Sequence, residues 1–446
     1  MNRAYFQGLK VVAQQKAEPF IFEIDTTLAG VSNSDQFQFT GAVGKYDVEA
    51  YQGGVEVASY SNLVNQQTIT LPSSGAFELR VIPKAAGFDK LTFNNGGDKN
   101  KLLQILEWGD YGVNRPNQSG AFRGCNLTEI PGNGKWFDVV TNGTRMFESN
   151  SLISLPAGME LPNLSIAERM FESNSLTSLP SEMELPNLTN GFSMFIFNSL
   201  TSLPAGMELP NLSSGISMFR NNNLASLPSG MELPLLTSGS SMFQNNSLAS
   251  LPSGMELPNL TSAFAMFSRN SLTSLPAGME LPNLTNGTSM FSVNNLTSLP
   301  AGMELPNLTI AREMFVVNNL TSLPAAMTLP SLTNGDRMFR QNNLTSLPVG
   351  MELPNLTNGN EMFRQSQLTS LPSGIKLPSL TNGTLMFAAS TFNTTRYSQL
   401  LIDLEANNAN NNVTFHGGNS QYNTQGETAR DALTARGWTI TDGGLE

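Results

Sequence analysis

Few residues in this 446-residue chain could carry out nucleophilic, acid–base or metal chemistry. There is one histidine, His416, and one cysteine, Cys125, which excludes a multi-histidine zinc site, a thiolate cluster and an intramolecular disulfide. No Gly-x-Ser-x-Gly motif is present, and no pair of carboxylates is singled out as a general acid and base. We therefore expect no catalytic residue, no cofactor and no enzymatic activity.

A column of glutamates is the one pattern that could hold a metal ion. It recurs at multiples of 24 residues, is interrupted by Thr328 and ends at Lys376. Its members are Glu160, Glu184, Glu208, Glu232, Glu256, Glu280, Glu304 and Glu352. Carboxylates stacked at the spacing of paired strands, about 4.8 Å, repel one another and should splay into water or share cations. Hard cations need several converging oxygens, so we expect a solvated stripe with weak Ca²⁺ binding at most.

An asparagine recurs three residues after most Met-Phe pairs, until Ser366 breaks the series. The members are Asn150, Asn174, Asn198, Asn222, Asn246, Asn270, Asn294, Asn318 and Asn342. An inward amide offers two N–H donors and one acceptor oxygen to backbone groups left free where a coil bends. We therefore predict a structural ladder rather than a ligand site.

Four positions around each Met-Phe pair vary while the rest of the repeat is nearly constant: the two residues before Met and the two after Phe. Stacking leaves them unconstrained, so we predict that they lie on the surface, where Arg, Gln and aromatic side chains suit recognition. Drift on an unconstrained face explains the same variation. The candidate partner-binding residues are Phe192, Phe197, Arg220, Gln244, Phe264, Arg269, Arg312, Arg340 and Arg364.

All these columns depend on one period. Eleven Met-Phe pairs, from Met146 to Phe387, recur at intervals of 24 residues. One such unit cannot bury its own apolar face, so neighbouring units must stack, and the segment is predicted to be a solenoid. The stacked apolar positions of one copy are Leu296, Leu299, Met303, Leu305, Leu308 and Phe315.

Prolines and turn residues divide each coil into short pieces. Pro300 and Pro306 each lack a backbone donor and stand where the coil must turn. Thr-Asn-Gly favours the start of a helix or turn, so Gly-x-x-Met-Phe is predicted as a short helical turn and Leu-Thr-Ser-Leu as a short parallel strand. The alternative register puts the strand across Met-Phe-x-x-Asn, and periodicity does not choose between them.

The segments that flank the repeat have a different composition. Residues 1–120 alternate apolar and polar residues in short runs at 20–24, 37–39, 46–50, 68–71 and 77–81, which predicts an antiparallel, sandwich-like β domain leading into an N-terminal cap. The solenoid occupies 121–387. Residues 388–446 are predicted to form a small α+β cap over its open end, with helices at 397–407 and 427–436 and strands at 413–416 and 438–441.

Charge and hydropathy exclude two classes of partner. The formal net charge is −11, which disfavours binding to the phosphate backbone of a nucleic acid. No stretch approaches the roughly 20 apolar residues that a membrane helix requires. The first six residues contain no apolar run of signal-peptide length, so we expect no export through a membrane.

The repeat resembles the BspA-like leucine-rich repeat family of bacterial and phage surface proteins. Residues 290–300, MFSVNNLTSLP, follow the family pattern, with Asn294 where many members have cysteine. The flanks at 91–99, 104–109 and 437–444 are similar to segments that bracket such repeats in phage-encoded members. The resemblance covers nearly all of the chain after residue 20, and it implies a leucine-rich repeat fold used for adhesion.

Three functions follow as expectations. The first is a virion protein, a bacteriophage tail fibre or head fibre, that binds a host-surface glycan or protein through the solenoid and other virion proteins through its N-terminal domain. The second is a purely structural virion component or spacer. The third is a bacterial surface adhesin, which would need its own export route. Homo-oligomerisation is left open.

Overall fold

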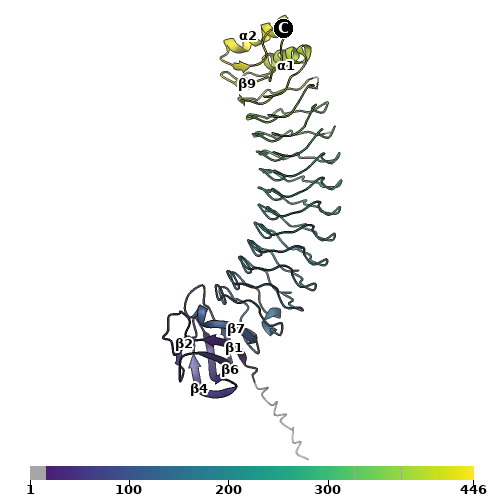
Figure 1. Cartoon of the computed structure of the whole chain (residues 1–446). Helices are drawn as coiled ribbons and strands as arrows, with labels where there is room; N and C mark the ends of the chain where they lie inside the picture. Colours follow the sequence, from purple (N-terminus) through teal and green to yellow (C-terminus); the bar gives the residue numbers. More distant parts are fainter. Residues whose placement is uncertain (1–16, 326, 373) are drawn as a thin grey trace, which may run out of the picture.

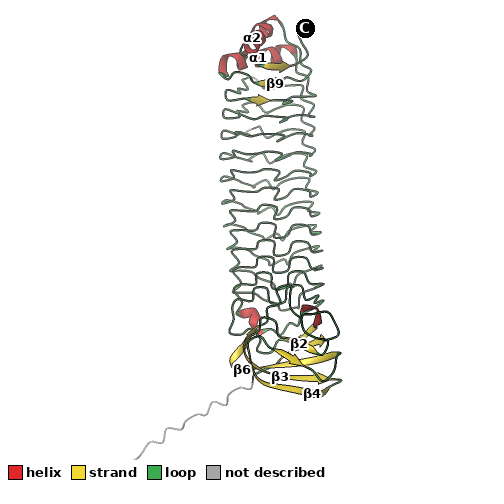
Figure 2. Ribbon diagram, turned by 90° about the vertical axis from the view of Figure 1, so that its left-hand side faces the viewer, coloured by secondary structure: helices red, strands yellow, loops and turns green. Residues whose placement is uncertain are grey.

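The structure, a computed structural model, describes residues 17–446 except residues 326 and 373. The described chain forms a long rod with a β domain at one end and two helices at the other (Figure 1). The rod curves in Figure 1 and is nearly straight in Figure 2, so it bends mainly in one plane. The expectation that the chain carries no signal peptide concerns residues 1–6, which lie outside the described residues.

The N-terminal domain is built on an antiparallel five-stranded sheet of order β4-β3-β6-β1-β7, beside the two-stranded sheet β2-β5. Alternate residues of β1, namely Phe20, Phe22 and Ile24, point into the core, which explains the period of two in the sequence. The strands are β1 Phe20–Asp25, β2 Gln36–Gln38, β3 Val43–Gln52, β4 Val55–Val64, β5 Thr68–Thr70, β6 Ala76–Lys90 and β7 Leu102–Glu107. Each of the five runs of alternating residues overlaps one of these strands, although 37–39 and 68–71 extend one residue past β2 and β5.

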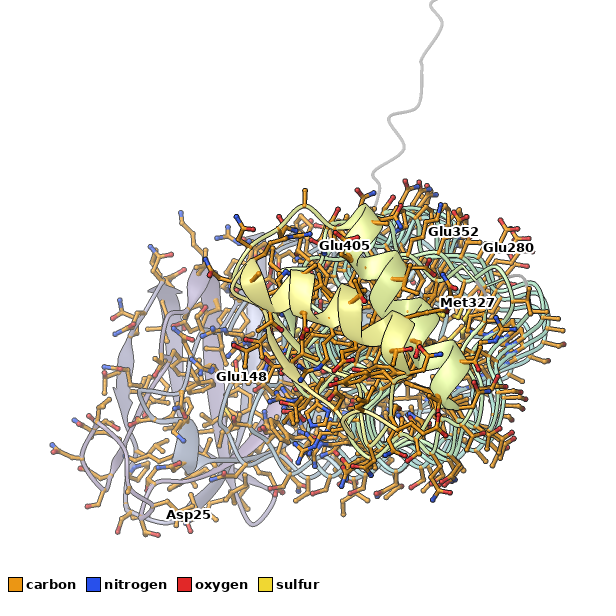
Figure 3. The ribbon with its side chains drawn as sticks, turned by 90° about the horizontal axis from the view of Figure 1, so that it is seen from above. Asp25, Glu148, Glu280, Met327, Glu352 and Glu405 are labelled. Carbon is orange, nitrogen blue, oxygen red and sulfur yellow. The ribbon has the colours of Figure 1, made fainter. Side chains whose placement is uncertain are left out.

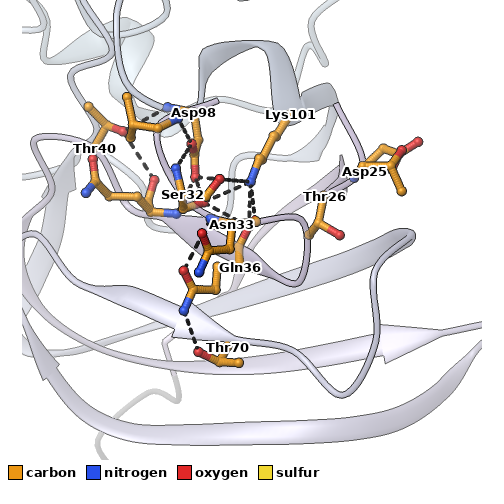
Figure 4. A network of polar contacts seen from close by, with 12 residues as sticks. Asp25, Thr26, Ser32, Asn33, Gln36, Thr40, Thr70, Asp98 and Lys101 are labelled. Atoms are coloured by element: carbon orange, nitrogen blue, oxygen red, sulfur yellow. Dashed lines mark hydrogen bonds and ion pairs between the residues drawn. The ribbon is translucent and has the colours of Figure 1, made fainter. Parts of the chain in front are cut away.

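A buried ion pair fixes the loop between β1 and β2 (Figure 4). Lys101, at the end of the 3-10 helix η1 Lys99–Lys101, and Asp98 are both buried. The Lys101 ammonium donates to the carbonyls of Ser32 and Gln36 at 3.0 and 2.9 Å, and the Asp98 carboxylate accepts from the Gln38 amide at 2.7 Å. These bonds satisfy both charges inside the domain, as buried ions require.

Aromatic rings join the β domain to the first coil. Phe20 of β1 stacks on Trp108 at 5.7 Å, Trp108 packs edge-on against Phe122 at 5.5 Å, and Phe122 stacks on Phe147 at 5.8 Å. The short 3-10 helix η2 Lys135–Asp138 adds Trp136, which packs on Trp108. One continuous core therefore runs from the sheet into the solenoid.

The solenoid core consists of columns of identical side chains. Phenylalanine rings from Phe147 to Phe387 stack nearly parallel, with centroids 5.5–5.7 Å apart and planes within 9°. The neighbouring Met and Leu columns are equally buried. The ring spacing exceeds the roughly 4.8 Å expected between paired strands.

The coils pair chiefly through the stretch around Met-Phe, and fewer bonds run along Leu-Thr-Ser-Leu, such as that from the Thr297 amide to the Thr273 carbonyl at 3.3 Å. In one coil the amides of Gly287, Ser289, Phe291 and Val293 donate to carbonyls of the next coil at 2.8–3.0 Å. The residue just before Gly287, Asn286, forms a single parallel bridge with Ser262 of the previous coil and with Ile310 of the next, and the same bridges recur along the solenoid. The alternative register is therefore closer to the structure than the favoured one.

Two local predictions for the coil are wrong. Gly-x-x-Met-Phe is not a helical turn, because Ser289 has φ of 54° and the Met290 amide closes a β-turn onto Gly287. Leu-Thr-Ser-Leu is not a continuous strand, because the Leu272 amide is taken by the side chain of Asn294 at 3.0 Å and not by a backbone carbonyl. The prolines do lie in turns, as at Pro300, whose carbonyl accepts from the Met303 amide at 3.1 Å.

The C-terminal segment covers the last coil (Figure 3). Strand β8 Asn382–Gly383 of that coil pairs in parallel with β9 Thr414–His416, which pairs in turn with β10 Thr439–Thr441. Helices α1 Thr394–Asn407 and α2 Thr424–Ala435 pack on each other. No helix among the described residues is long and apolar enough to cross a membrane.

Candidate binding surface

The candidate binding residues lie on what we call the variable arc, the two residues before each Met and the two after each Phe. The second residue after Phe forms a column on the outside of the rod, which we call the exposed column. Most of its members are exposed, and all have positive φ. The members are Ser149, Ser173, Phe197, Asn221, Asn245, Arg269, Val293, Val317, Gln341, Gln365 and Ala389.

The other three positions of the arc are mostly buried or half-buried, so the prediction that all four lie on the surface is wrong. Ser193 and Ile196 are each 5% exposed, whereas Phe197 is 51% exposed. Like positions of adjacent coils cover one another, as where the Ser268 and Ser292 hydroxyls bond at 2.7 Å. Stacking therefore constrains these positions as well.

The candidate residues differ accordingly. Phe197 and Arg269 belong to the exposed column, and Phe264 and Arg312, two residues before Met, are also exposed. The half-buried candidates are Phe192, Arg220, Gln244, Arg340 and Arg364.

Two predicted binding arginines are engaged inside the protein. Arg340 and Arg364 both contact the buried carboxylate of Glu361, at 3.2 and 3.0 Å, and Arg337 contacts it at 3.3 Å. Arg337 also reaches Glu313 at 3.4 Å. Arg340 and Arg364 thus pair with the buried Glu361 carboxylate and are less available to a partner than the exposed candidates.

This network was not predicted, although the sequence carries a signal for it. Glu313, Arg337 and Glu361 occupy the position just before Met in three successive repeats and alternate in sign every 24 residues. Burial tends to raise the pKa of Glu361, but hydrogen bonds from Arg364 and Arg337 and the nearby positive charge lower its pKa below the usual value. At the other end of the solenoid, burial raises the pKa of Glu172 despite the charge of Arg169.

The asparagine ladder ties each coil to the one before it. The Asn222 side chain accepts from the Leu200 amide at 3.0 Å and donates to the carbonyls of Phe195 and Phe219 at 2.9 and 3.2 Å. The same pattern recurs along the ladder. Asn246 and Asn270 are half-buried and make these bonds too.

A second asparagine ladder, which the sequence analysis did not recognise, runs along the outside. In each Pro-Asn-Leu-Thr segment the Asn amide donates to the proline carbonyl of the previous coil, as from Asn283 to Pro258 at 2.8 Å. Two residues on, the Thr hydroxyl donates to the previous Thr carbonyl, as from Thr285 to Thr261 at 3.0 Å. The sequence signal was the conservation of both side chains between repeats.

The glutamate column lies on the periphery of the stack, where Figure 3 shows Glu280 and Glu352 at the outer edge. Small hollows lie between adjacent coils, such as one of about 170 Å³ bordered by Glu280 and Glu304. Within the described residues, no three His, Cys, Asp or Glu side chains converge closely enough to hold a metal ion.

The two unique reactive side chains lie apart from the variable arc. Cys125 is buried in the first coil at the position of the asparagine ladder, and burial raises the pKa of its thiol. His416 lies in β9, where its Nδ1 accepts from the Gly418 amide at 3.1 Å. Burial lowers the pKa of His416, against the opposing charge of Asp442. Both side chains therefore serve packing and local bonding.

No protein-family model matches the sequence, and no curated protein matches it either. Among solved structures, the chain is similar to YopM, a leucine-rich effector protein from Yersinia pestis. The two share 22% sequence identity over 63% of this chain and 80% of YopM, with a TM-score of 0.31. A likeness this weak says nothing about what this chain binds. The solenoid of leucine-rich repeats is established by its own inter-coil bonds and buried columns.

Proposed function

We propose that this chain is a non-enzymatic adhesion protein of the BspA-like leucine-rich repeat type, a tail fibre or head fibre of a bacteriophage virion. It binds a host-surface glycan or protein through the exposed column of the solenoid. The observation that carries this proposal is the set of costly residues in that column, Phe197, Val293 and Val317, which are 51%, 41% and 40% exposed.

Each of these residues is unfavourable for the isolated protein. Val293 and Val317 have φ of 55° and 56°, a conformation that β-branched residues rarely adopt and that costs about 1–3 kcal/mol. Their apolar side chains also lie in water. Asn221 and Asn245 show that polar residues better suited to this conformation are accepted in the same column. A binding partner that covers the column would offset both costs.

The placement in a virion is supported by the resemblance of the sequence to phage-encoded members of the family. In this proposal the N-terminal β domain docks onto other virion proteins, and the rod carries the exposed column away from the particle.

Adsorption of the purified chain to susceptible host cells tests the proposal. A double variant, Phe197→Ser with Arg269→Ser, should fold normally because Ser149 and Ser173 occupy the same column. Hot-spot side chains contribute about 2 kcal/mol or more, so adsorption should weaken by at least roughly ten-fold.

The matched control is Thr273→Ala with Thr321→Ala on another exposed face, where Ala225 and Ala249 already stand in other repeats. This control should adsorb like the parent. Equal adsorption by the double variant and the control would reject the exposed column as the binding surface.

A structural spacer is the second candidate, and the continuous core that joins the β domain to the solenoid favours it. A spacer predicts that neither the parent nor the variants adsorb to host cells. In that case the protein should still be found in purified virions by mass spectrometry.

A further inference from the structure

A shallow open groove with a volume of about 610 Å³ runs along the solenoid. It extends from the coil of Thr237 to that of Ser331. One side is formed by the outer asparagine ladder and the other by the threonines two positions on. The asparagines are Asn259, Asn283 and Asn307.

The groove offers mainly hydrogen-bond acceptors. Thr261 and Thr285 line the groove, and each donates its only hydroxyl hydrogen to a threonine carbonyl of the previous coil at 3.0 Å, so each hydroxyl oxygen can act only as an acceptor. Asn259 and Asn283 each use one amide hydrogen on a proline carbonyl, which leaves the second as a donor, and their side-chain oxygens accept no bond within the described residues. A ligand rich in hydroxyl donors matches this surface.

Charge and backbone bonding narrow the class of ligand. All of the lining side chains are Thr, Asn or Ser, so the groove holds no charge for an ionic polymer to pair with. The Thr261 and Thr285 amides already donate to the carbonyls of the preceding threonines at 3.0 Å. The coil edge therefore does not offer these groups to an added peptide strand.

We propose that this groove binds a linear, neutral polysaccharide that lies along the rod, with sugar hydroxyls donating to the Asn and Thr oxygens and the C–H faces of the rings on the Thr methyl groups. The proposal rests on the proposed adhesion and names the chemistry of one receptor class. It places that contact in the groove, in addition to the exposed column.

The test uses the full chain on an array of immobilised linear neutral glucans, mannans and galactans and their sulfated counterparts. The groove variant is Asn283→Leu with Asn307→Leu. Leu235 already stands at this position of the repeat, so the variant should fold. The matched control is Asn187→Leu with Asn211→Leu, which removes the same bonds to proline carbonyls outside the groove.

The parent and the control should bind at least one neutral glycan in preference to its sulfated form, and the groove variant should bind it at least about ten-fold more weakly. No binding to any neutral glycan, a preference for sulfated glycans, or equal binding by the groove variant and the control would overturn the groove assignment.

Host-cell adsorption of the same proteins separates this proposal from the adhesion proposal. Suppose that the parent adsorbs to cells, that the Phe197→Ser and Arg269→Ser double variant does not, and that the parent binds no glycan on the array. The adhesion proposal then stands and the groove assignment fails. If the groove variant fails on the array and the parent does not adsorb to cells, the groove stands and the adhesion fails.

Discussion

At the scale of single residues, the asparagine ladder solves the problem of the bent backbone. Each side-chain amide supplies one acceptor and two donors to backbone groups that have no backbone partner. The Asn246 oxygen accepts from the Leu224 amide, and its N–H groups donate to the carbonyls of Phe219 and Phe243. At the end of the series Ser366 is fully buried and its hydroxyl has no partner within the described residues. The ladder is therefore weakest near the C-terminal cap.

Replacing Asn246 with Leu should lower the free energy of unfolding by about 1–3 kcal/mol, because buried backbone groups lose their partners. Chemical denaturation monitored by circular dichroism measures the change. Ser247→Ala, at the exposed neighbouring residue, is the control and should stay within about 0.5 kcal/mol of the parent. An Asn246 variant as stable as its control would refute the structural role.

The carboxylate of Glu361 should make stability depend on pH. Its pKa is lowered in the folded protein, so its contribution is present above the usual value of 4.5 and is lost as the pH falls through the folded value. At pH 7 the free energy of unfolding of Glu361→Gln should therefore be about 1–3 kcal/mol below that of the parent, and the variant should melt at a lower temperature. The two melting temperatures should converge as the pH is lowered.

Thermal melts from pH 7 to pH 3 test this. Glu352→Gln, at an exposed position of the glutamate column, should melt like the parent throughout. A gap between Glu361→Gln and the parent that stays constant with pH would show that the carboxylate acts through packing alone.

At the scale of elements, the exposed column is the strained part of each coil. The Val317 amide donates to the Arg340 carbonyl of the next coil at 3.1 Å, which holds the positive φ whatever side chain is present. The cost therefore depends on residue type. Asparagine tolerates this conformation better than any β-branched residue.

Val317→Asn should raise the free energy of unfolding by about 1 kcal/mol by relieving this strain. The reverse change, Asn245→Val, should lower it by at least as much, because it also removes the bond from the Asn245 side chain to Asn221. Denaturation of both variants gives the comparison. If valine and asparagine prove equivalent at both sites, the column stores no strain, and the argument for a binding role loses its main support.

At the scale of the whole molecule, stability should be close to a sum over coils and their interfaces, because each coil contacts only its neighbours. Phe243 stacks on Phe219 and Phe267 at the same distance of 5.6 Å, so any coil can be exchanged for the next. The ends are different, since aromatic rings of the β domain cover one and the C-terminal helices cover the other (Figures 1 and 3).

Deletion of residues 239–262, one full period, should leave a folded, shorter rod with a cooperative melt near that of the parent. Deletion of residues 239–250, half a period, should abolish cooperative unfolding because the Leu, Met and Phe columns fall out of phase. Circular dichroism and calorimetry distinguish the two. A half-period deletion that melts like the full one would mean that column stacking does not hold the rod together.

Much of this architecture was predictable because it depends on composition and period. A Leu or Phe that recurs every 24 residues must be buried against its own copies, and Asn222 or Asn294 beside it must find backbone partners there. The same alternation predicted strands at 20–24 and 77–81, which lie within β1 and the longer β6, since an antiparallel sheet with one buried face requires a period of two.

Only the tertiary structure decided which residues of the variable arc face the solvent. The sequence by itself determined that these positions vary, but the direction of each side chain depends on a backbone φ of about 55° and on what the next coil places above it. Residues 24 apart become hydrogen-bonded or ion-paired neighbours only when the coils stack. For that reason Arg340 pairs with Glu361, whereas Phe197 and Val317 are left exposed.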